Sequence, residues 1–463
     1  MANTYNPVFL SWMPDRTQLR RPYYLSLANL LESDIKSGKL LPGTKLPPQR
    51  ELAEYAQINF TTVTRAYDLC REKNLIYGVT GRGTFVAAQP GLDGEKKTDI
   101  IDLGVVCGFD HLKNYIVEAS ESVLQKGYLE KLYSYSAEGG HLHQKAAAVR
   151  YLQKFGVSAD EEHVALFAGA QNAISATLLS LFKLGDTIAT DEFTYANLIG
   201  TAKLAHIRLC PIPGDANGMI TDKLDTICSK QKITGIFLMP NCANPTGITL
   251  SMARKAALAQ IIKKHQLLLI EDDLATIPPP EQSYQSFFAL LPEQTIYING
   301  AYKYLCGGLR VAPVTFPEKY RKILLDALFH LNIRTSALDA EIVTEMILSG
   351  KADLLLREKY GMAQRANKIF DRIFPECAAL PHSDGDFFRM LPLPSCCGNA
   401  REMEQYFLRY GIAVQHSGRF AVCNSRRAFL RISLSSAGSE ARLRKGLSAL
   451  RLALTEQQKV FQP

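Results

Sequence analysis

The chain has 463 residues, of which 47% are hydrophobic and 21% are charged. This balance is that of an ordinary globular protein, and the length predicts two to four folding units of roughly 100–200 residues each. No apolar run approaches the roughly 20 residues that cross a bilayer, and the start of the chain lacks the hydrophobic region of a signal peptide. The ten cysteines form no CxxC pair. We therefore expect a cytoplasmic protein without a membrane-spanning segment or a metal site.

The positive charge is unevenly distributed. The net charge is +8, and residues 1–88 hold eleven Lys or Arg against seven Asp or Glu, a difference of +4. Half of the excess thus lies in about a fifth of the chain. This distribution permits a domain that binds a polyanion at the N-terminus.

Residues 1–88 predict three short helices followed by a β-hairpin. Helical periodicity covers residues 24–37, 51–55 and 60–73. The expected core face of the first helix consists of Leu25, Leu27, Leu30, Leu31 and Ile35. Residues 74–88 read as two strands around a glycine-rich turn at 80–83. This order is typical of a winged helix-turn-helix. Residues 89–99, polar and rich in glycine and charge, are predicted to be a linker.

Residues 100–463 alternate between helical stretches and short β-rich runs. The runs are predicted at 164–169, 187–190, 233–240, 267–272 and 295–300. Such alternation favours an α/β fold with a mostly parallel sheet and helices on both of its faces. A smaller α+β subdomain is predicted from about residue 351 to 463, with helices at 351–373, 400–410 and 438–454.

The motifs of the first domain resemble a known DNA-binding fold. Residues 39–86, KLLPGTKLPPQRELAEYAQINFTTVTRAYDLCREKNLIYGVTGRGTFV, are similar to the winged helix of the GntR family. The resemblance implies binding to a double-stranded DNA operator, and thus association with the nucleoid. The candidate DNA contacts are Lys45, Arg50, Thr61, Thr62, Arg65 and Arg82.

Physical reasoning supports the third helix as the reading element, because a recognition helix presents short polar and basic side chains opposite its apolar stripe. Here that face is provided by Thr61, Thr62 and Thr64 together with Arg65. The family often has Ser-Arg where this chain has Asn59-Phe60, so one expected contact is missing. The alternative is that these residues are merely solvated.

The second domain contains an ordered set of motifs with residues suited to particular chemistry. The turn NPTG begins at Asn244, Asp272 follows 28 residues later, Lys303 lies 31 residues further, and Arg310 comes seven residues after that. A lysine can form an imine with an aldehyde, and a carboxylate can keep a pyridine nitrogen protonated. An arginine beside the start of a helix can bind phosphate. The set resembles the fold-type I aminotransferases over most of residues 100–455.

The resemblance assigns a role to each matching residue. Lys303 is the catalytic lysine, Asp272 binds the pyridine nitrogen, and Asn244 binds the phenolic oxygen. Residues implied to bind the phosphate are Arg310, Gly169, Ala170, Gln171 and, from the neighbouring subunit, Tyr135. Tyr195 matches the aromatic residue that stacks on the ring, and Arg431 matches the arginine that holds a substrate carboxylate. The alternatives are that Lys303 is a surface lysine, that Asp272 is a simple strand-end acid and that Arg431 is a partner in a structural ion pair. For Tyr195 and Tyr135 the alternative is an aromatic residue of the core.

Several positions depart from the family pattern. Leu274 and Ala275 stand where a tyrosine usually binds the phenolic oxygen, and Gly300-Ala301-Tyr302 replaces the usual hydroxyl residues before the lysine. Asn197 stands where some relatives carry a second arginine. Weaker cofactor binding or slower turnover is the expected result.

A winged helix fused to this second domain resembles the MocR subfamily of GntR regulators. The resemblance implies a head-to-tail homodimer with exchanged domains. It also implies that an amine or amino-acid effector is sensed by aldimine exchange at Lys303. The alternative function is an active aminotransferase that carries a DNA-binding domain.

Overall fold

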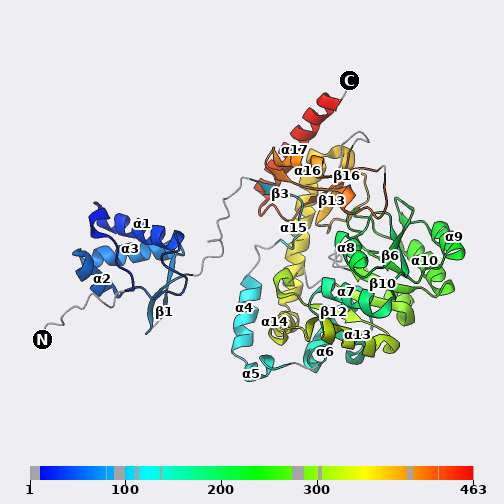
Figure 1. Cartoon of the computed structure of the whole chain (residues 1–463), viewed down its shortest axis with the longest axis horizontal. Helices are drawn as coiled ribbons and strands as arrows, with labels where there is room; N and C mark the ends of the chain where they lie inside the picture. The colour runs from blue at the N-terminus through cyan, green and yellow to red at the C-terminus, as the bar shows by residue number, and fades with distance from the viewer. Residues whose placement is uncertain are drawn as a thin grey trace. The chain divides into compact units, whose positions relative to one another are not determined.

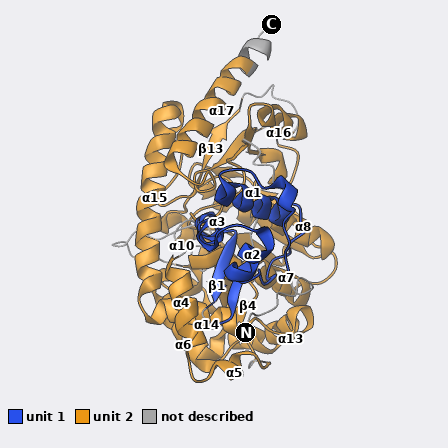
Figure 2. Cartoon of the chain, turned by 90° about the vertical axis from the view of Figure 1, so that its left-hand side faces the viewer, with its two compact units in different colours: residues 1–98 blue, residues 99–463 orange. Residues whose placement is uncertain are grey.

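The computed structural model describes residues 11–79, 81–87, 100–109, 114–135, 138–273, 286–300, 305–393, 400–425 and 427–461. The chain forms two compact units, residues 1–98 and residues 99–463 (Figure 2). Among the helices described in these ranges, none is long and apolar enough to cross a membrane.

The described part of unit 1 contains three α-helices and a hairpin, preceded by a short 3-10 helix at Arg16–Gln18 (Figure 1). Its elements are α1 (Tyr23–Lys36), α2 (Gln49–Ala56), α3 (Phe60–Glu72), β1 (Ile76–Val79) and β2 (Gly83–Val86). The two strands pair antiparallel, with Ile76 opposite Val86. Helix α2 begins two residues earlier than predicted, because Pro48 is the N-cap and the helix starts directly after it.

The core of unit 1 is formed where one face of each helix meets the others. Helix α3 buries Val63, Ala66, Tyr67 and Cys70, and the Tyr67 hydroxyl donates a hydrogen bond to Pro47 O at 2.9 Å. The predicted core face of α1 was wrong at Leu25, which is 39% exposed. Leu25 lies two positions from the buried Leu27, and two helical steps turn a side chain through about 200°.

Unit 2 is built on a seven-stranded sheet in the order β4-β12-β11-β10-β9-β5-β6. The strands are β4 (Val164–Phe167), β5 (Thr187–Asp191), β6 (Arg208–Ile212), β9 (Gly235–Leu238), β10 (Leu268–Asp273), β11 (Thr295–Asn299) and β12 (Ala312–Thr315). Strand β12 runs antiparallel to both of its neighbours, and the remaining pairs are parallel. The mostly parallel sheet is therefore confirmed.

Helices cover both faces of this sheet. Successive residues of a strand point to opposite faces, so neighbouring residues of β10 pack with different helices. Ile270 packs with α7 (Ala170–Leu181) and α13 (Glu318–Asn332). The preceding Leu269 packs with α10 (Met252–Lys264). The other helices of the large part are α4 (Asn114–Leu124), α5 (Leu129–Leu132), α6 (Leu142–Leu152), α8 (Ala196–Leu204), α9 (Thr221–Lys230), α11 (Phe287–Leu290) and α14 (Ala337–Leu348). A short hairpin joins β7 (Gly214–Asp215) and β8 (Gly218–Met219).

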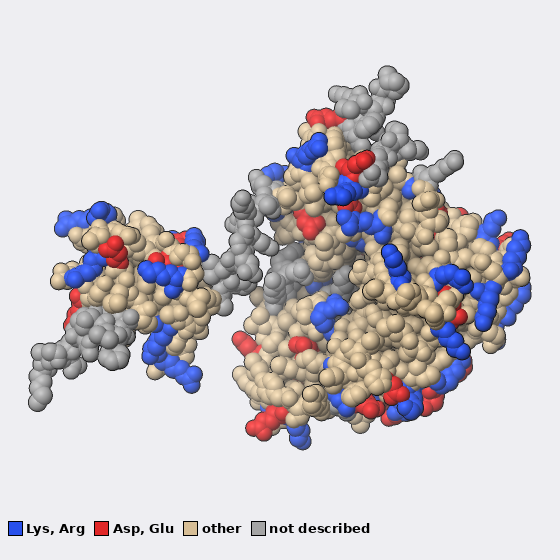
Figure 3. Space-filling view, in the orientation of Figure 1, with Lys and Arg blue, Asp and Glu red and all other residues tan. Residues whose placement is uncertain are grey.

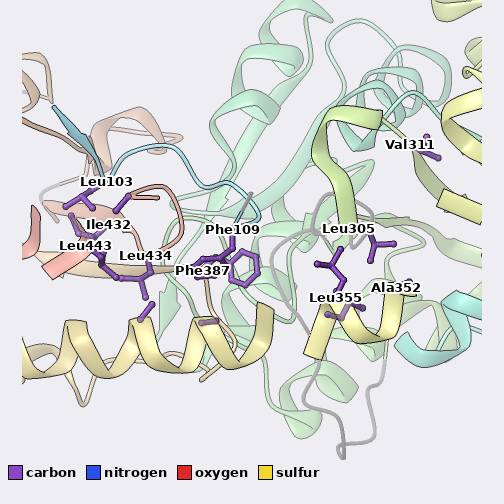
Figure 4. Packing of buried hydrophobic residues seen from close by; sticks show 14 of the residues in the cluster. Leu103, Phe109, Leu305, Val311, Ala352, Leu355, Phe387, Ile432, Leu434 and Leu443 are labelled. Atoms are coloured by element: carbon purple, nitrogen blue, oxygen red, sulfur yellow. The ribbon is translucent and has the colours of Figure 1, made fainter. Parts of the chain in front are cut away.

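A smaller subdomain contains the three-stranded antiparallel sheet β13-β16-β15. Its elements are β13 (Phe388–Pro392), β14 (Ile412–Ala413), β15 (Gln415–His416), β16 (Phe429–Ser433), α15 (Lys351–Ile373), α16 (Ala400–Leu408) and α17 (Glu440–Phe461). Its core includes Leu103, Ile432 and Leu443 (Figure 4).

The small subdomain also takes in the first described residues of unit 2. Strand β3 (Ile101–Asp102) pairs in parallel with β14, and the Leu103 backbone N–H donates to Ala413 O at 2.8 Å. The Ser433 N–H donates to Leu103 O at 2.7 Å. A subdomain boundary near residue 351 therefore leaves out the segment around residues 101–103.

Candidate cofactor site and DNA-binding face

A cavity lies at the carboxyl end of the large sheet, where parallel α/β sheets usually bind ligands. It is lined by Gly169, Ala170, Gln171, Tyr195, Gly300, Cys306, Gly307, Arg310, Val311 and Ala312. Five of these were predicted from sequence to contact the cofactor: Gly169, Ala170, Gln171, Tyr195 and Arg310. The fold brings them together from α7, α8 and the segment before β12.

The start of α7 and Arg310 form an anion-binding corner of this cavity. Gly169 is the N-cap of α7, so the unpaired N–H groups of the first helical turn begin there. Its φ is +85°, and a Cβ at this position would lie 2.7 Å from Arg310 Nη2. Only glycine admits the guanidinium this close to the helix start. The corner suits a phosphate group.

Tyr195 and Asp272 occupy the same region. Asp272 is 1% exposed near the carboxyl end of β10. Tyr195 immediately precedes α8, and its hydroxyl accepts a hydrogen bond from Asn197 Nδ2 at 3.0 Å. Burial raises the pKa of Tyr195, the charge of Asp272 raises it further, and Arg310 and Arg431 oppose the shift. The charges of Asp272, Arg310 and Arg431 therefore all reach the hydroxyl of Tyr195.

The NPTG turn meets the small subdomain at this site. Gly247 donates its N–H to Ala243 O at 2.7 Å, which closes the turn around the buried Asn244. Asn244 Oδ1 accepts a hydrogen bond from Arg431 Nη1 at 2.8 Å. Two residues that the sequence predicted to bind the cofactor and the effector are thus in direct contact.

Arg431 is held by two residues that sequence analysis did not identify. Its Nη2 donates to Gly104 O at 2.6 Å and to Gln415 Oε1 at 2.5 Å. Burial lowers the pKa of Arg431 to about 10, so the group stays charged at neutral pH. The Nε atom is buried and has no hydrogen-bond partner within the described part of the chain. No sequence motif marks Gly104 or Gln415.

The remaining predicted positions are either exposed or outside the described residues. Lys303 lies outside the described residues, as do Leu274, Ala275, Ala301 and Tyr302. The chain is described up to Gly300, whose N–H donates to Asp273 O at 3.1 Å. Tyr135 is 84% exposed.

The six predicted DNA contacts lie on the surface of unit 1. Thr62 is partly buried, and the others, Lys45, Arg50, Thr61, Arg65 and Arg82, are exposed. The Arg65 guanidinium lies over the Tyr24 ring, 4.2 Å from its centroid. Arg82 lies between the two strands of the wing, where its N–H donates to Val79 O at 3.0 Å. Basic side chains occupy several separate parts of this unit's visible face (Figure 3).

Comparison with known proteins agrees with both halves. Residues 109–450 match the family model for class I and II aminotransferases, and residues 23–86 match bacterial regulatory proteins of the gntR family. The chain is 35% identical to an uncharacterized HTH-type transcriptional regulator, YdeF, of Bacillus subtilis (strain 168). That match covers 98% of this chain and 99% of the relative.

Two further matches illustrate the range of the likeness. MocR of Rhizobium meliloti, a probable rhizopine catabolism regulatory protein, is 25% identical over 54% of this chain and 56% of its own. The α-aminoadipate aminotransferase LysN from Thermus thermophilus has a TM-score of 0.71 at 21% identity. The match covers 78% of this chain and 94% of the LysN chain. This structural likeness concerns the fold.

The chain belongs to the HTH-type transcription regulators in which a GntR winged helix is joined to an aminotransferase class I and II domain. Within that class it belongs to the MocR subfamily. This membership indicates pyridoxal phosphate as the cofactor. The corner formed by Gly169 and Arg310 and the buried carboxylate of Asp272 fit its phosphate and its ring nitrogen.

Proposed function

We propose that this chain is a pyridoxal-phosphate-dependent regulator that binds operator DNA and senses an amine or amino-acid effector. The observation that carries the proposal is the hydrogen bond between Arg431 and Asn244. It joins the residue expected to hold the effector's carboxylate to the residue expected to hold the cofactor's phenolic oxygen. A ligand that engages Arg431 therefore acts directly on the cofactor site.

In this proposal the cofactor supplies an aldehyde that combines reversibly with amines. Lys303 would hold the cofactor through its ε-amine, at the place for which the amine of an effector would compete. Asp272 keeps a proton on the ring nitrogen, while Arg310 and the first turn of α7 bind the phosphate. Tyr195 provides the ring that stacks on the pyridine.

Arg431 would orient an effector that carries a carboxylate. Its Nε N–H is directed to no acceptor in the described part of the chain. A carboxylate oxygen could accept this hydrogen bond in a charge-assisted pair. Asn197, in place of a second arginine, disfavours an effector with another acidic group.

We further propose a head-to-tail homodimer. The exposed ring of Tyr135 is available to reach the phosphate of a neighbouring subunit. Ligand binding can change DNA binding only as far as the effector's affinity differs between two arrangements of the dimer. Analytical ultracentrifugation with and without the cofactor tests the assembly, and a monomer under both conditions would contradict it.

Lys303→Ala is the direct test of the cofactor assignment. The purified wild-type protein should absorb visible light when loaded with pyridoxal phosphate, and the variant should not. The variant should also lose the change in operator binding that amines cause in the wild type. Unchanged absorbance would reject Lys303 as the attachment point.

A measurement of catalytic turnover distinguishes the alternative function, an active aminotransferase, from the proposed regulator. Repeated conversion of an amino acid in the presence of a keto acid would favour the enzyme. DNA binding that depends on the ligand, without such turnover, would favour the regulator.

A further inference from the structure

Phe60 is the first residue of α3, and its side chain is 43% exposed. The same helix buries Val63, Ala66, Tyr67 and Cys70 in the core of unit 1. A single exposed ring is ordinary on a protein surface. The position of Phe60 sets it apart, because the N-terminal residues of a recognition helix are those that contact base edges.

The polar groups around Phe60 are largely engaged within the protein. Asn59 Oδ1 accepts hydrogen bonds from the Thr61 N–H at 3.0 Å and from Thr61 Oγ1 at 2.9 Å. The Thr64 hydroxyl donates to Gln49 Oε1 at 2.8 Å. The hydroxyl groups of Thr61 and Thr64 are therefore engaged within the protein, whereas the ring of Phe60 remains accessible.

The surroundings of the ring suit DNA. The Arg50 guanidinium lies 6.0 Å from the centroid of the Phe60 ring, and Thr61 and Arg65 are exposed on the same helix. The arginines can contact backbone phosphates while the apolar ring contacts the edge of a base between them. A phenyl ring neither donates nor accepts conventional hydrogen bonds. In the major groove it can distinguish bases chiefly through the methyl group at C5 of thymine.

We propose that Phe60 reads a thymine in the operator by packing against its 5-methyl group. The inference rests on the proposed DNA-binding function and adds a base preference to it. Phe60 thus determines specificity, while Arg50 and Arg65 supply attraction to phosphate.

The test uses the full-length protein and a duplex that it selects from a random library. Each thymine of the selected site is replaced in turn by deoxyuridine, which removes only the methyl group. The wild type should lose about three- to tenfold in affinity at one thymine of each half-site. Phe60→Ala should make that position indifferent to the replacement, and Phe60→Leu should retain part of the discrimination.

Tyr77→Ala is the matched control, since Tyr77 is a 45% exposed ring on the hairpin rather than on α3. It should leave the thymine profile unchanged. Thermal unfolding of Phe60→Ala should match the wild type, because the ring lies outside the core. The inference is overturned if no thymine is sensitive in the wild type, or if Phe60→Ala weakens all sequences equally. If the wild type selects no duplex, the proposed function falls with it.

Discussion

Arg431 and Asn244 are 187 positions apart in the chain, yet Arg431 Nη1 donates to Asn244 Oδ1 at 2.8 Å. Arg431 belongs to β16 of the small subdomain, and Asn244 belongs to the turn beside the large sheet. The contact makes the position of the small subdomain part of the cofactor site.

Arg431→Lys should remove the response to effectors that carry a carboxylate. A lysine keeps the charge but cannot reach three acceptors with a planar group. Leaving Asn244, Gly104 and Gln415 without donors should also cost about 2 kcal/mol of unfolding free energy. Titration calorimetry with an amino acid and with its decarboxylated amine measures the loss of the response to the carboxylate.

Arg427→Lys serves as the control for that variant. Its side chain is 54% exposed, and its guanidinium lies 3.9 Å from Glu192. It should change stability by less than about 0.5 kcal/mol. Equal effector responses in the two variants would contradict the assigned role of Arg431.

Gly169→Ala should weaken binding of pyridoxal phosphate by about tenfold or more, because the new Cβ displaces an arginine that pairs with the phosphate. That Cβ would lie 2.7 Å from Arg310 Nη2. Gly185→Ala is the control for backbone strain alone. Its φ is +82°, similar to that of Gly169, but a Cβ added there would meet no atom within 4 Å. Titration of the apoprotein with cofactor, followed by absorbance, should show a loss in the first variant alone.

Arg65→Gln should lower the affinity for duplex DNA and reduce the slope of log K against log salt by about one unit, as expected for one lost phosphate contact. The guanidinium is held over the Tyr24 ring and is already oriented on the exposed face of α3. Arg71→Gln is the control on the same helix, because Arg71 pairs with Asp68 at 2.6 Å. A salt slope that is the same in both variants would argue against the contact.

Asp191 makes stability depend on pH. Burial raises the pKa of Asp191 from 3.8 to about 7. Between these values the folded chain binds more protons than the unfolded chain, so this contribution to stability is lost as the pH rises from about 4 to about 7. The free energy of unfolding of Asp191→Asn, relative to that of the wild type, should therefore be up to about 4 kcal/mol higher at pH 8 than at pH 4.

Thermal unfolding of the full chain at several pH values measures this difference. Asp326→Asn is the exposed control, with a side chain that is 53% exposed, and should leave the pH dependence unchanged. A parallel shift of Asp191→Asn at every pH would show that Asp191 does not titrate in this range.

The elements and site residues that could be predicted from the sequence were those marked by local periodicity or by motif spacing. Helix α15 was predicted at 351–373 and is observed as Lys351–Ile373, because its apolar face repeats over six turns. Strands β4, β5, β9, β10 and β11 were located because buried strands are continuous apolar runs, whereas β6 and β12 of the same sheet were not predicted. The cavity residues Gly169, Tyr195 and Arg310 were found through the order of the motifs.

What the sequence could not reveal depends on contacts between distant segments. Strand β3 has two residues, too few for a period, and its partner Ile412 lies more than three hundred positions away. Gly104 and Gln415 contact Arg431 through a backbone oxygen and a side-chain amide in no recognisable pattern. Such partners are fixed only when the subdomain folds.

The pairing of β3 with β14 determines where the linker is attached. The first strand after residues 89–99 belongs to the small subdomain, through bonds such as the Ile101 N–H to Gly411 O at 2.7 Å. A rotation of the small subdomain against the large sheet would therefore displace the end of the linker directly. Movements confined to helices around the large sheet would leave it in place. Strand β3 is thus tied by backbone hydrogen bonds to the part of unit 2 that contains Arg431.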